Sequence, residues 1–213
     1  MKTRLLKIDD ICLSQYSFLT REDCCFYFGE YFSGQGYGYS PTNNLIHNLK
    51  KSPSRRGKPE WKYKLHAIET VADWIASVDD LLWDDPNSLW IPVPPSKSIE
   101  DKDYDDRLVK ILESLKRKST SFSFSELITV KESIEGSHNL ADGMRPRPED
   151  HLENFVVDET LILPEPKTVF VFDDVITTGS HFRAVDTLLR KKFRNTVVYG
   201  IFVARAVRLA QEF

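Results

Sequence analysis

The stretch Val169-Phe-Val-Phe-Asp-Asp-Val-Ile-Thr-Thr-Gly-Ser180 decides the fold of this chain. Its apolar part, with the preceding Thr168, is β-branched and aromatic on both faces, which is typical of a strand buried in a parallel sheet. Asp173 and Asp174 come next, at the carboxyl end of that strand, where open α/β sheets bind ligands. Small residues, hydroxyls and a glycine follow, just before a predicted helix over 182–193.

The loop after the two acids has the composition of an anion site. Backbone N–H groups of such a loop, with a helix N-terminus behind them, bind phosphate-sized anions. Two carboxylates beside one phosphate cradle suggest a ligand that carries both a diol and a phosphate. A ribose 5-phosphate has both groups.

Two other interpretations of this stretch are compatible with parts of its pattern. An apolar strand followed by Asp-Asp is also the pattern of a Walker B segment, which needs a Walker A loop as its partner. The chain contains no Gly-x-x-x-x-Gly-Lys-Ser/Thr, so a P-loop NTPase is excluded. The plainer alternative is a core strand followed by a capped helix, with acids that only solvate a loop. That alternative stays open at this point.

The whole stretch resembles the signature segment of the type I phosphoribosyltransferases, in which apolar residues precede Asp-Asp, a short loop and Thr-Gly. The resemblance implies that Asp173 and Asp174 hold the ribose hydroxyls of phosphoribosyl pyrophosphate. It also implies that the 5-phosphate is bound by Val175, Ile176, Thr177, Thr178, Gly179, Ser180 and His181. The family usually has Thr or Ser where this chain has His181, but an imidazole also donates hydrogen bonds to phosphate.

A second segment, Leu89-Trp-Ile-Pro-Val-Pro-Pro-Ser-Lys-Ser98, is similar to the loop that binds pyrophosphate in this family. Its Pro-Val-Pro form resembles the ComF-like branch, which is linked to DNA uptake. The resemblance implies that Pro95, Ser96 and Lys97 contact the diphosphate, since exposed N–H groups and an ammonium stabilise a polyanion. A connection that is merely stiffened by prolines is the alternative.

A hood over the diphosphate is expected from Arg145 and Arg147, whose guanidinium forks suit phosphate oxygens; both are equally compatible with a surface role. The chain departs from the ComF-like branch in two places. It lacks the N-terminal four-cysteine zinc module, and Lys102-Asp-Tyr-Asp-Asp106 stands where the branch has Arg-Gly-Phe-Asn-Gln. We expect this acidic cluster to repel pyrophosphate unless Mg²⁺ bridges them.

The resemblance implies a protein that binds Mg-phosphoribosyl pyrophosphate, with Asp173 and Asp174 reaching Mg²⁺ indirectly through the ligand. Two functions follow from it and both stay open. One is an enzyme that transfers the phosphoribosyl group to a nitrogen acceptor and releases pyrophosphate. The other is a non-catalytic sensor of this compound or of a nucleotide, as an accessory of DNA-uptake or defence machinery. The sequence does not name the acceptor, and a homodimer is compatible with the fold.

A nucleic-acid interface is a further hypothesis. Aromatic residues Trp61 and Tyr63 are interleaved with cations, as in sites that bind single strands. The cations of this basic run are Lys50, Lys51, Arg55, Arg56, Lys58, Lys62 and Lys64. A solvated helix end is the alternative, because the chain as a whole has a net charge of −3.

Composition sets wider bounds. The chain has 213 residues, 41% of them hydrophobic, and no apolar run approaches the ~20 residues that span a bilayer. The N-terminus lacks the apolar core of a signal peptide. Cys12, Cys24 and Cys25 form no Cys-x-x-Cys pair, so we expect reduced thiols in a cytoplasmic protein without membrane contact.

The remaining pattern predicts an N-terminal extension, residues 1–85, followed by a phosphoribosyltransferase-like α/β domain, 86–213, in one compact unit. The extension is expected to hold a β-hairpin (24–32 with 37–39), a short helix from Ser40-Pro41 and a long helix over 61–82 with Leu65 inward. The α/β domain is expected to contain strands 89–93, 127–130, 168–173 and 196–204 and helices 103–118 and 182–193. Alternating strands and helices predict a twisted, mainly parallel sheet flanked by helices.

Overall fold

The computed structural model describes residues 4–78, 81, 83–133, 146–161 and 164–209. Its centre is a five-stranded sheet in the order β1-β2-β7-β6-β3. Neighbouring strands run parallel except for the edge pair β1 and β2. The strands are β1 (Leu6–Lys7), β2 (Cys24–Phe32), β7 (Val197–Val207), β6 (Thr168–Ile176) and β3 (Ser88–Pro92). The expected mixed α/β fold with a mostly parallel sheet is confirmed.

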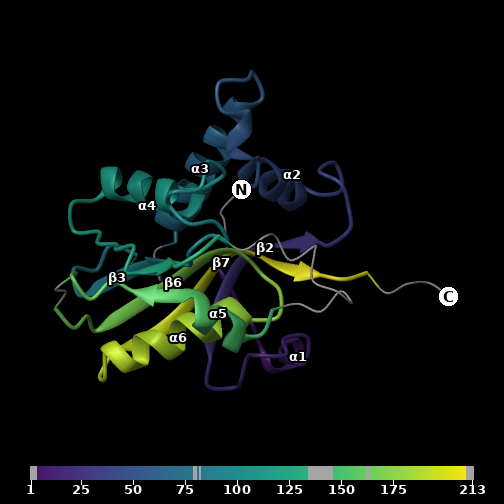
Figure 1. Cartoon of the computed structure of the whole chain (residues 1–213). Coiled ribbons are helices and arrows are strands. Elements are labelled where there is room, and N and C mark those ends of the chain that lie inside the picture. Colours follow the sequence, from purple (N-terminus) through teal and green to yellow (C-terminus); the bar gives the residue numbers. More distant parts are fainter. Residues whose placement is uncertain (1–3, 79–80, 82, 134–145, 162–163, 210–213) are drawn as a thin grey trace.

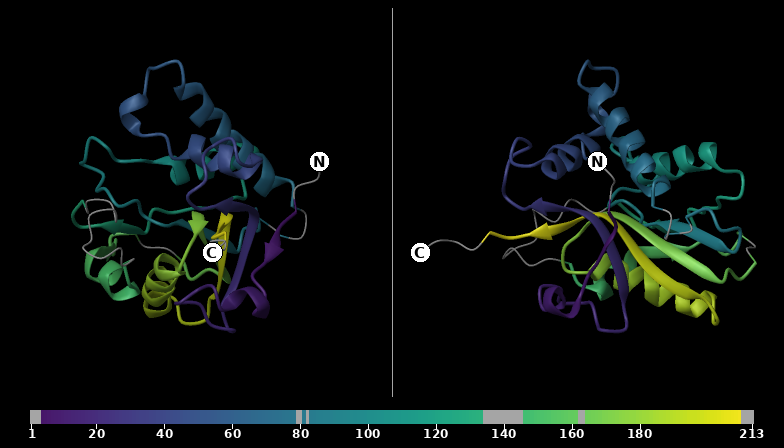
Figure 2. Two further views of the ribbon diagram at one scale, coloured as in Figure 1. Left: turned by 90° about the vertical axis from the view of Figure 1, so that its right-hand side faces the viewer. Right: turned by 180° about the vertical axis from the view of Figure 1, so that it is seen from behind.

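Helices cover both faces of the sheet (Figure 1). One face carries α2 (Pro41–Leu49), α3 (Trp61–Ala76) and α4 (Arg107–Lys118), with the short 3-10 helix η1 (Pro53–Arg55) between α2 and α3. The other face carries α1 (Asp10–Leu13), α5 (Pro148–Asn154) and α6 (Ser180–Lys192). Figure 2 shows the same layers from two further directions.

The core lies where β3 and β6 pair. Val169, Val171 and Phe172 of β6 are fully buried, as expected for a strand that is apolar on both faces. Trp90 of β3 is also fully buried, and its indole N–H donates to the carbonyl of Trp83 at 2.9 Å. Satisfying this one polar atom allows the largest side chain of the strand to enter the core.

The expected hairpin between 24–32 and 37–39 is wrong. Residues 37–39 form a turn, and β2 is an interior strand that pairs parallel with β7 over Cys24↔Tyr199 to Phe32↔Val207. Asn43 ends the strand, because its side chain accepts from the Phe32 N–H at 3.0 Å and donates to the Phe32 carbonyl at 3.1 Å. The chain then turns directly into α2, whose N-cap is Ser40.

The chain leaves β3 and β6 toward opposite sides of the sheet. After β3 it passes through α4 on one face and returns beyond β3, where Phe124 bridges Trp90 in parallel. After β6 it passes through α6 on the other face and returns as β7, on the far side of β6. Adjacent strands whose connections diverge leave a crevice at their carboxyl ends, where such sheets bind ligands.

A second, two-stranded antiparallel sheet lies outside the main one. It joins β4 (Ile128–Val130) to β5 (Phe155–Val157), so the strand expected at 127–130 exists but does not belong to the parallel sheet. Neither β5 nor α5 was expected, because 146–157 is polar and weakly periodic. Helix α5 starts at Pro148, after the Arg147 N–H donates to the Asp150 carboxylate at 2.7 Å.

Three helix boundaries or faces also differ from expectation. The helix expected over 61–82 ends at Ala76, and the one expected from 103 starts at Arg107. On α3, Leu65 is 52% exposed whereas Lys64 is 1% exposed. The reason is an acidic partner for Lys64 inside the protein, described below. Among the described residues, no helix is both long and apolar enough to cross a bilayer.

Candidate functional site

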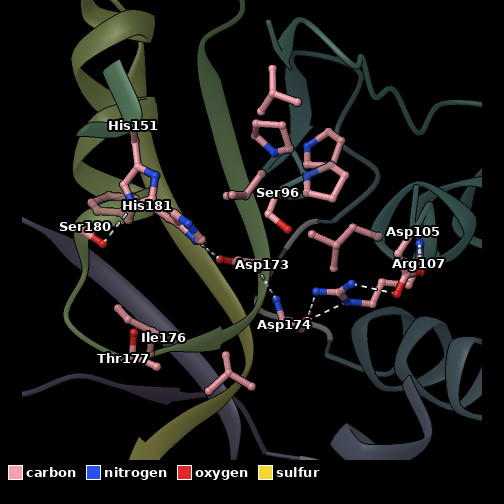
Figure 3. A pocket seen from close by; sticks show the side chains of 18 of the residues that line it. Ser96, Asp105, Arg107, His151, Asp173, Asp174, Ile176, Thr177, Ser180 and His181 are labelled. Carbon is pink, nitrogen blue, oxygen red and sulfur yellow. Dashed lines mark hydrogen bonds and ion pairs between the residues drawn. The ribbon is translucent and has the colours of Figure 1, made fainter. Parts of the chain in front are cut away.

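A cavity of about 880 Å³ opens at the carboxyl ends of β3 and β6. It is lined from one side by the loop after β3, from another by the Asp-Asp segment and the start of α6, and from a third by Lys50 and Arg107. Figure 3 shows Asp173 and Asp174 between His181 and His151 on one side and Arg107 and Asp105 on the other. The strand pairing explains why the cavity opens here.

Strand β6 extends four residues beyond the end of its pairing with β3. Their ladder ends at Pro92↔Phe172, with the Val93 N–H donating to the Phe172 carbonyl at 2.9 Å. On its other edge β6 stays paired with β7 as far as Ile176↔Arg205. Residues 173–176 are therefore held by one neighbour only, and their other edge borders the cavity.

Asp174 is bound by two cations from different parts of the chain. The Arg107 Nε and a terminal nitrogen each lie 2.7 Å from its Oδ2, and the Lys50 Nζ lies 3.0 Å from its Oδ1. The Asp174 side chain is 4% exposed, whereas that of Lys50 is 44% exposed. A buried carboxylate with a fork on one oxygen and an ammonium on the other is a fixed anion.

The ion pairs continue from Arg107 into the helical layer. The other terminal nitrogen of Arg107 lies 2.8 Å from Asp105 Oδ2, and the Lys64 Nζ lies 2.6 Å from Asp105 Oδ1. The Lys64 ammonium also donates to the Lys51 carbonyl at 2.7 Å. Lys50, Asp174, Arg107, Asp105 and Lys64 thus form an alternating charge chain across α2, β6, α4 and α3.

The charge chain sets the protonation of its members. Burial alone would raise the pKa of Asp174, but Arg107 and then Lys50 outweigh it and hold this pKa below its ordinary value. Burial lowers the pKa of Lys64, against the opposing effect of the Asp105 carboxylate. Burial would likewise lower the pKa of Arg107, but Asp174 and Asp105 reverse the direction. Asp174 therefore stays ionised.

Asp173 faces the opposite wall. Its Oδ1 accepts the backbone N–H of Asp174 at 2.7 Å, and its Oδ2 lies 3.3 Å from the His181 Nδ1. His151 packs edge-on against His181, with 4.2 Å between ring centroids, and its Nε2 lies 3.3 Å from the Ser180 hydroxyl. Burial, and secondly the neighbouring His181, lower the pKa of His151 to about 3, so that its ring is neutral.

The loop between β6 and α6 is fixed from behind. Gly179 has φ +85°, and a Cβ at this position would lie 2.8 Å from Leu19 Cδ2. The N–H of Phe18 donates to the Thr178 carbonyl at 3.0 Å, and Arg183 of α6 donates to the Phe18 carbonyl at 3.2 Å. The N-terminal segment around Phe18 and Leu19 therefore packs against the loop and holds it at the N-terminus of α6. The N–H groups of the first helical turn have no partner within the helix and are available to an anion.

The structure brings most of the predicted site residues together. Pro95, Ser96, Lys97 and all residues from Asp173 to His181 line the cavity. Val175 and Ile176 do so as buried members of β6 rather than as loop residues. Arg147 does not line the cavity and pairs with Glu149 at 3.5 Å on an exposed surface. Arg145 lies outside the described residues.

The acidic cluster at 102–106 does not face the cavity as free negative charge. Asp105 is neutralised by Arg107 and Lys64, and Asp106 lies 3.9 Å from both Arg56 and Lys110. The expected repulsion of pyrophosphate stays a prediction, which these ion pairs do not favour. Local sequence could suggest only the pairs within 105–110, because Arg56 and Lys64 lie more than 40 positions earlier in the chain.

Several cations of the basic run at 50–64 also have partners within the protein. Lys50 and Lys64 point inward to carboxylates, Arg55 lies 3.4 Å from Glu60, and Arg56 stacks near Trp61 at 5.6 Å. The run is therefore not one continuous cationic surface, although Tyr63 remains 50% exposed. The nucleic-acid hypothesis stays a prediction that these contacts do not favour.

Four cavity residues escaped the sequence reasoning as site members. Lys50 was predicted only as a cation of the basic run and Arg107 only as part of a helix, and their approach to Asp174 depends on packing of α2 and α4. His151 was unassigned, and Asp105 was expected only as part of the acidic cluster that repels pyrophosphate. The only usable signal was their residue type beside helix termini, which is too common to select them.

The donor set does not fit a metal ion bound directly by protein. Both oxygens of Asp174 are committed to cations, and one oxygen of Asp173 to a backbone N–H. Among the residues that the structure describes, no cluster of three His, Cys, Asp or Glu side chains has the arrangement of a metal site. A Mg²⁺ ion carried by a diphosphate ligand remains an expectation.

No protein-family model matches this chain, and no curated protein sequence matches it. The resemblance to phosphoribosyltransferases therefore rests on the residues of the chain alone.

Proposed function

We propose that the cavity binds phosphoribosyl pyrophosphate, or a nucleotide built on the same ribose phosphate, in a type I phosphoribosyltransferase-like fold. The observation that carries the proposal is the arrangement at the end of β6. Two buried carboxylates lie at an open strand edge, directly before a loop that ends at Gly179, the N-cap residue of α6. A diol beside a phosphate matches that order of groups.

The ligand's parts have distinct partners in this proposal. Asp173 and Asp174 accept from the ribose hydroxyls, and the loop 177–180 with His181 binds the 5-phosphate. The loop of Pro95, Ser96 and Lys97, which follows the neighbouring strand β3, binds the diphosphate. All of these residues line one cavity of about 880 Å³, which is within the usual range for a small-molecule site.

The preferred activity is phosphoribosyl transfer. A nitrogen atom of the acceptor forms a bond to C1 as the bond from C1 to the diphosphate oxygen breaks, and pyrophosphate leaves with the electron pair. The carboxylates of Asp173 and Asp174 would stabilise the positive charge that develops on the ribose ring. No protein nucleophile takes part, so geometry and electrostatics supply the catalysis.

Calorimetric titration of phosphoribosyl pyrophosphate tests the proposal. We expect binding by the wild type and loss of most of that affinity in Asp173→Asn, which leaves the cations on Asp174 in place. No binding by folded wild type, with or without Mg²⁺, would overturn the proposed function.

Release of pyrophosphate separates the enzyme from the sensor. Wild-type protein is incubated with the ligand and a set of purine and pyrimidine bases, and pyrophosphate is measured with Asp173→Asn as the blank. Turnover supports the transferase. Tight binding without turnover for any base would favour a sensor that holds the same ligand.

A further inference from the structure

We propose that Lys50 and Arg107 supply the positive charge for which the resemblance implies Mg²⁺, so that the ligand binds without a divalent cation. The inference rests on the proposed function, since it concerns how the same cavity takes the diphosphate of phosphoribosyl pyrophosphate. It differs from the expectation for the family and is carried by the side chains around Asp174.

The position of these two cations is the first support. They reach Asp174 from α2 and from α4, and both line the cavity. A Mg²⁺ ion carried by the diphosphate would supply positive charge to this cavity. Here two protein cations already lie within 3.0 Å of Asp174.

Both cations keep N–H donors for a ligand. An ammonium has three donors, and the Asp174 carboxylate is the one partner of Lys50 Nζ within the described residues. A guanidinium has five, and the contacts of Arg107 to Asp174 and Asp105 use three. A ligand oxygen can therefore join Lys50 and Arg107 without displacing either from Asp174.

Exposure ranks the cations of the cavity wall. Lys50 is 44% exposed and Arg107 is 19% exposed, whereas Lys97 is 29% exposed and is drawn toward Asp101 at 3.7 Å. Lys50 is thus the most accessible cation on the described wall. We assign it as the direct diphosphate contact, and Arg107 as a second donor that also positions Asp174.

The test compares binding of phosphoribosyl pyrophosphate in excess Mg²⁺ and in EDTA, by calorimetry, for three proteins. They are the wild type, Lys50→Met and the matched control Lys51→Met. Lys51 is the next residue, its ammonium donates to Asn48 and lies 5.6 Å from the Tyr63 ring, and it does not line the cavity. Both variants remove one lysine charge from the same helix end.

We expect the wild type and Lys51→Met to bind the ligand with dissociation constants within about threefold in the two buffers. Lys50→Met should bind at least about tenfold more weakly in EDTA, the effect of one charge-assisted hydrogen bond, and Mg²⁺ should restore part of the loss. Inorganic pyrophosphate should follow the same order, and ribose 5-phosphate should bind Lys50→Met like the wild type.

Either of two results would overturn the inference while leaving the proposed function intact. One is wild-type binding that needs Mg²⁺, and the other is equal affinity of Lys50→Met and Lys51→Met for the ligand in EDTA. Absence of binding in both buffers by all three folded proteins would instead remove the proposed function. Circular dichroism of each protein identifies a variant that has unfolded, and Lys50→Gln then replaces Lys50→Met.

Discussion

Arg107 binds Asp174 through two nitrogens, each 2.7 Å from the same carboxylate oxygen, and the two residues are 67 positions apart in the chain. The contact ties α4 to the end of β6 and fixes one acid of the cavity as an anion. Structure and proposed function therefore depend on the same ion pair, and substitutions here need readouts for both.

Asp174→Asn should destabilise the protein by about 3 kcal/mol, because it removes the buried carboxylate between Arg107 and Lys50 and leaves Asp105 as the one remaining counter-charge of Arg107 in the described part of the chain. Asp173→Asn should cost about 1 kcal/mol or less, since its partners are a backbone N–H and His181 rather than a buried cation. Urea denaturation of the two variants measures the difference. Equal costs would mean that the charge chain contributes nothing at Asp174.

Lys64→Met should lower the free energy of unfolding by about 2 kcal/mol, less than the usual cost of breaking a buried pair because Arg107 still neutralises Asp105. Lys62→Met is the matched control on the exposed face of α3 and should change stability by no more than about 0.5 kcal/mol. Thermal melts of both variants check the prediction. If Lys64→Met left the stability unchanged, packing of the methionine would stabilise the fold as much as the ion pair does.

Gly179→Ala should weaken binding of ribose 5-phosphate and destabilise the fold, because a Cβ would lie 2.8 Å from Leu19 Cδ2 and the backbone has φ +85°. Gly57→Ala separates the two causes: its φ is +83°, but no atom lies within 4 Å of the added Cβ. The backbone cost of about 1 kcal/mol is then common to both variants. We expect the extra loss and the binding defect only in Gly179→Ala, by urea denaturation and calorimetry.

His151 should make the fold sensitive to mild acid. Its pKa of about 3 in the folded protein lies below the ordinary 6.5, so the unfolded chain takes up a proton first as the pH falls. Stability is complete above about pH 6.5 and is lost progressively toward pH 3. Between pH 7 and pH 5 the wild type should lose about 2 kcal/mol more than His151→Gln.

Urea denaturation of wild type and His151→Gln at both pH values measures that difference. Contributions that the two proteins share cancel in the comparison. Parallel pH profiles for the two proteins would show that the ring of His151 is not held neutral by burial.

Much of the fold could be predicted from local sequence. Continuous apolar character marks β3 and β6, and 3.6-residue periodicity marks α3, α4 and α6 to within a few residues at most ends. These signals are local, because burial on both faces or on one face dictates the residue types. The weakly patterned α5 and β5 gave no such signal, and β2 was paired with the wrong partner.

The error at β2 shows the limit. A strand followed by a glycine-rich turn predicts a hairpin. Pairing with β7, whose partner residues lie 175 positions later, satisfies the backbone N–H and C=O groups of β2 equally well. Local sequence cannot choose between partners that offer the same backbone hydrogen bonds. Packing of the whole sheet makes that choice.

The sequence by itself determined the mostly parallel α/β architecture and the place of the cavity residues Asp173 to His181 and Pro95 to Lys97, because a strand end and its following loop are contiguous in the chain. Only the tertiary structure decided the electrostatics of that cavity. Lys50, Arg107 and His151 reach it from separate helices, and charges interact through distance in space rather than separation in sequence.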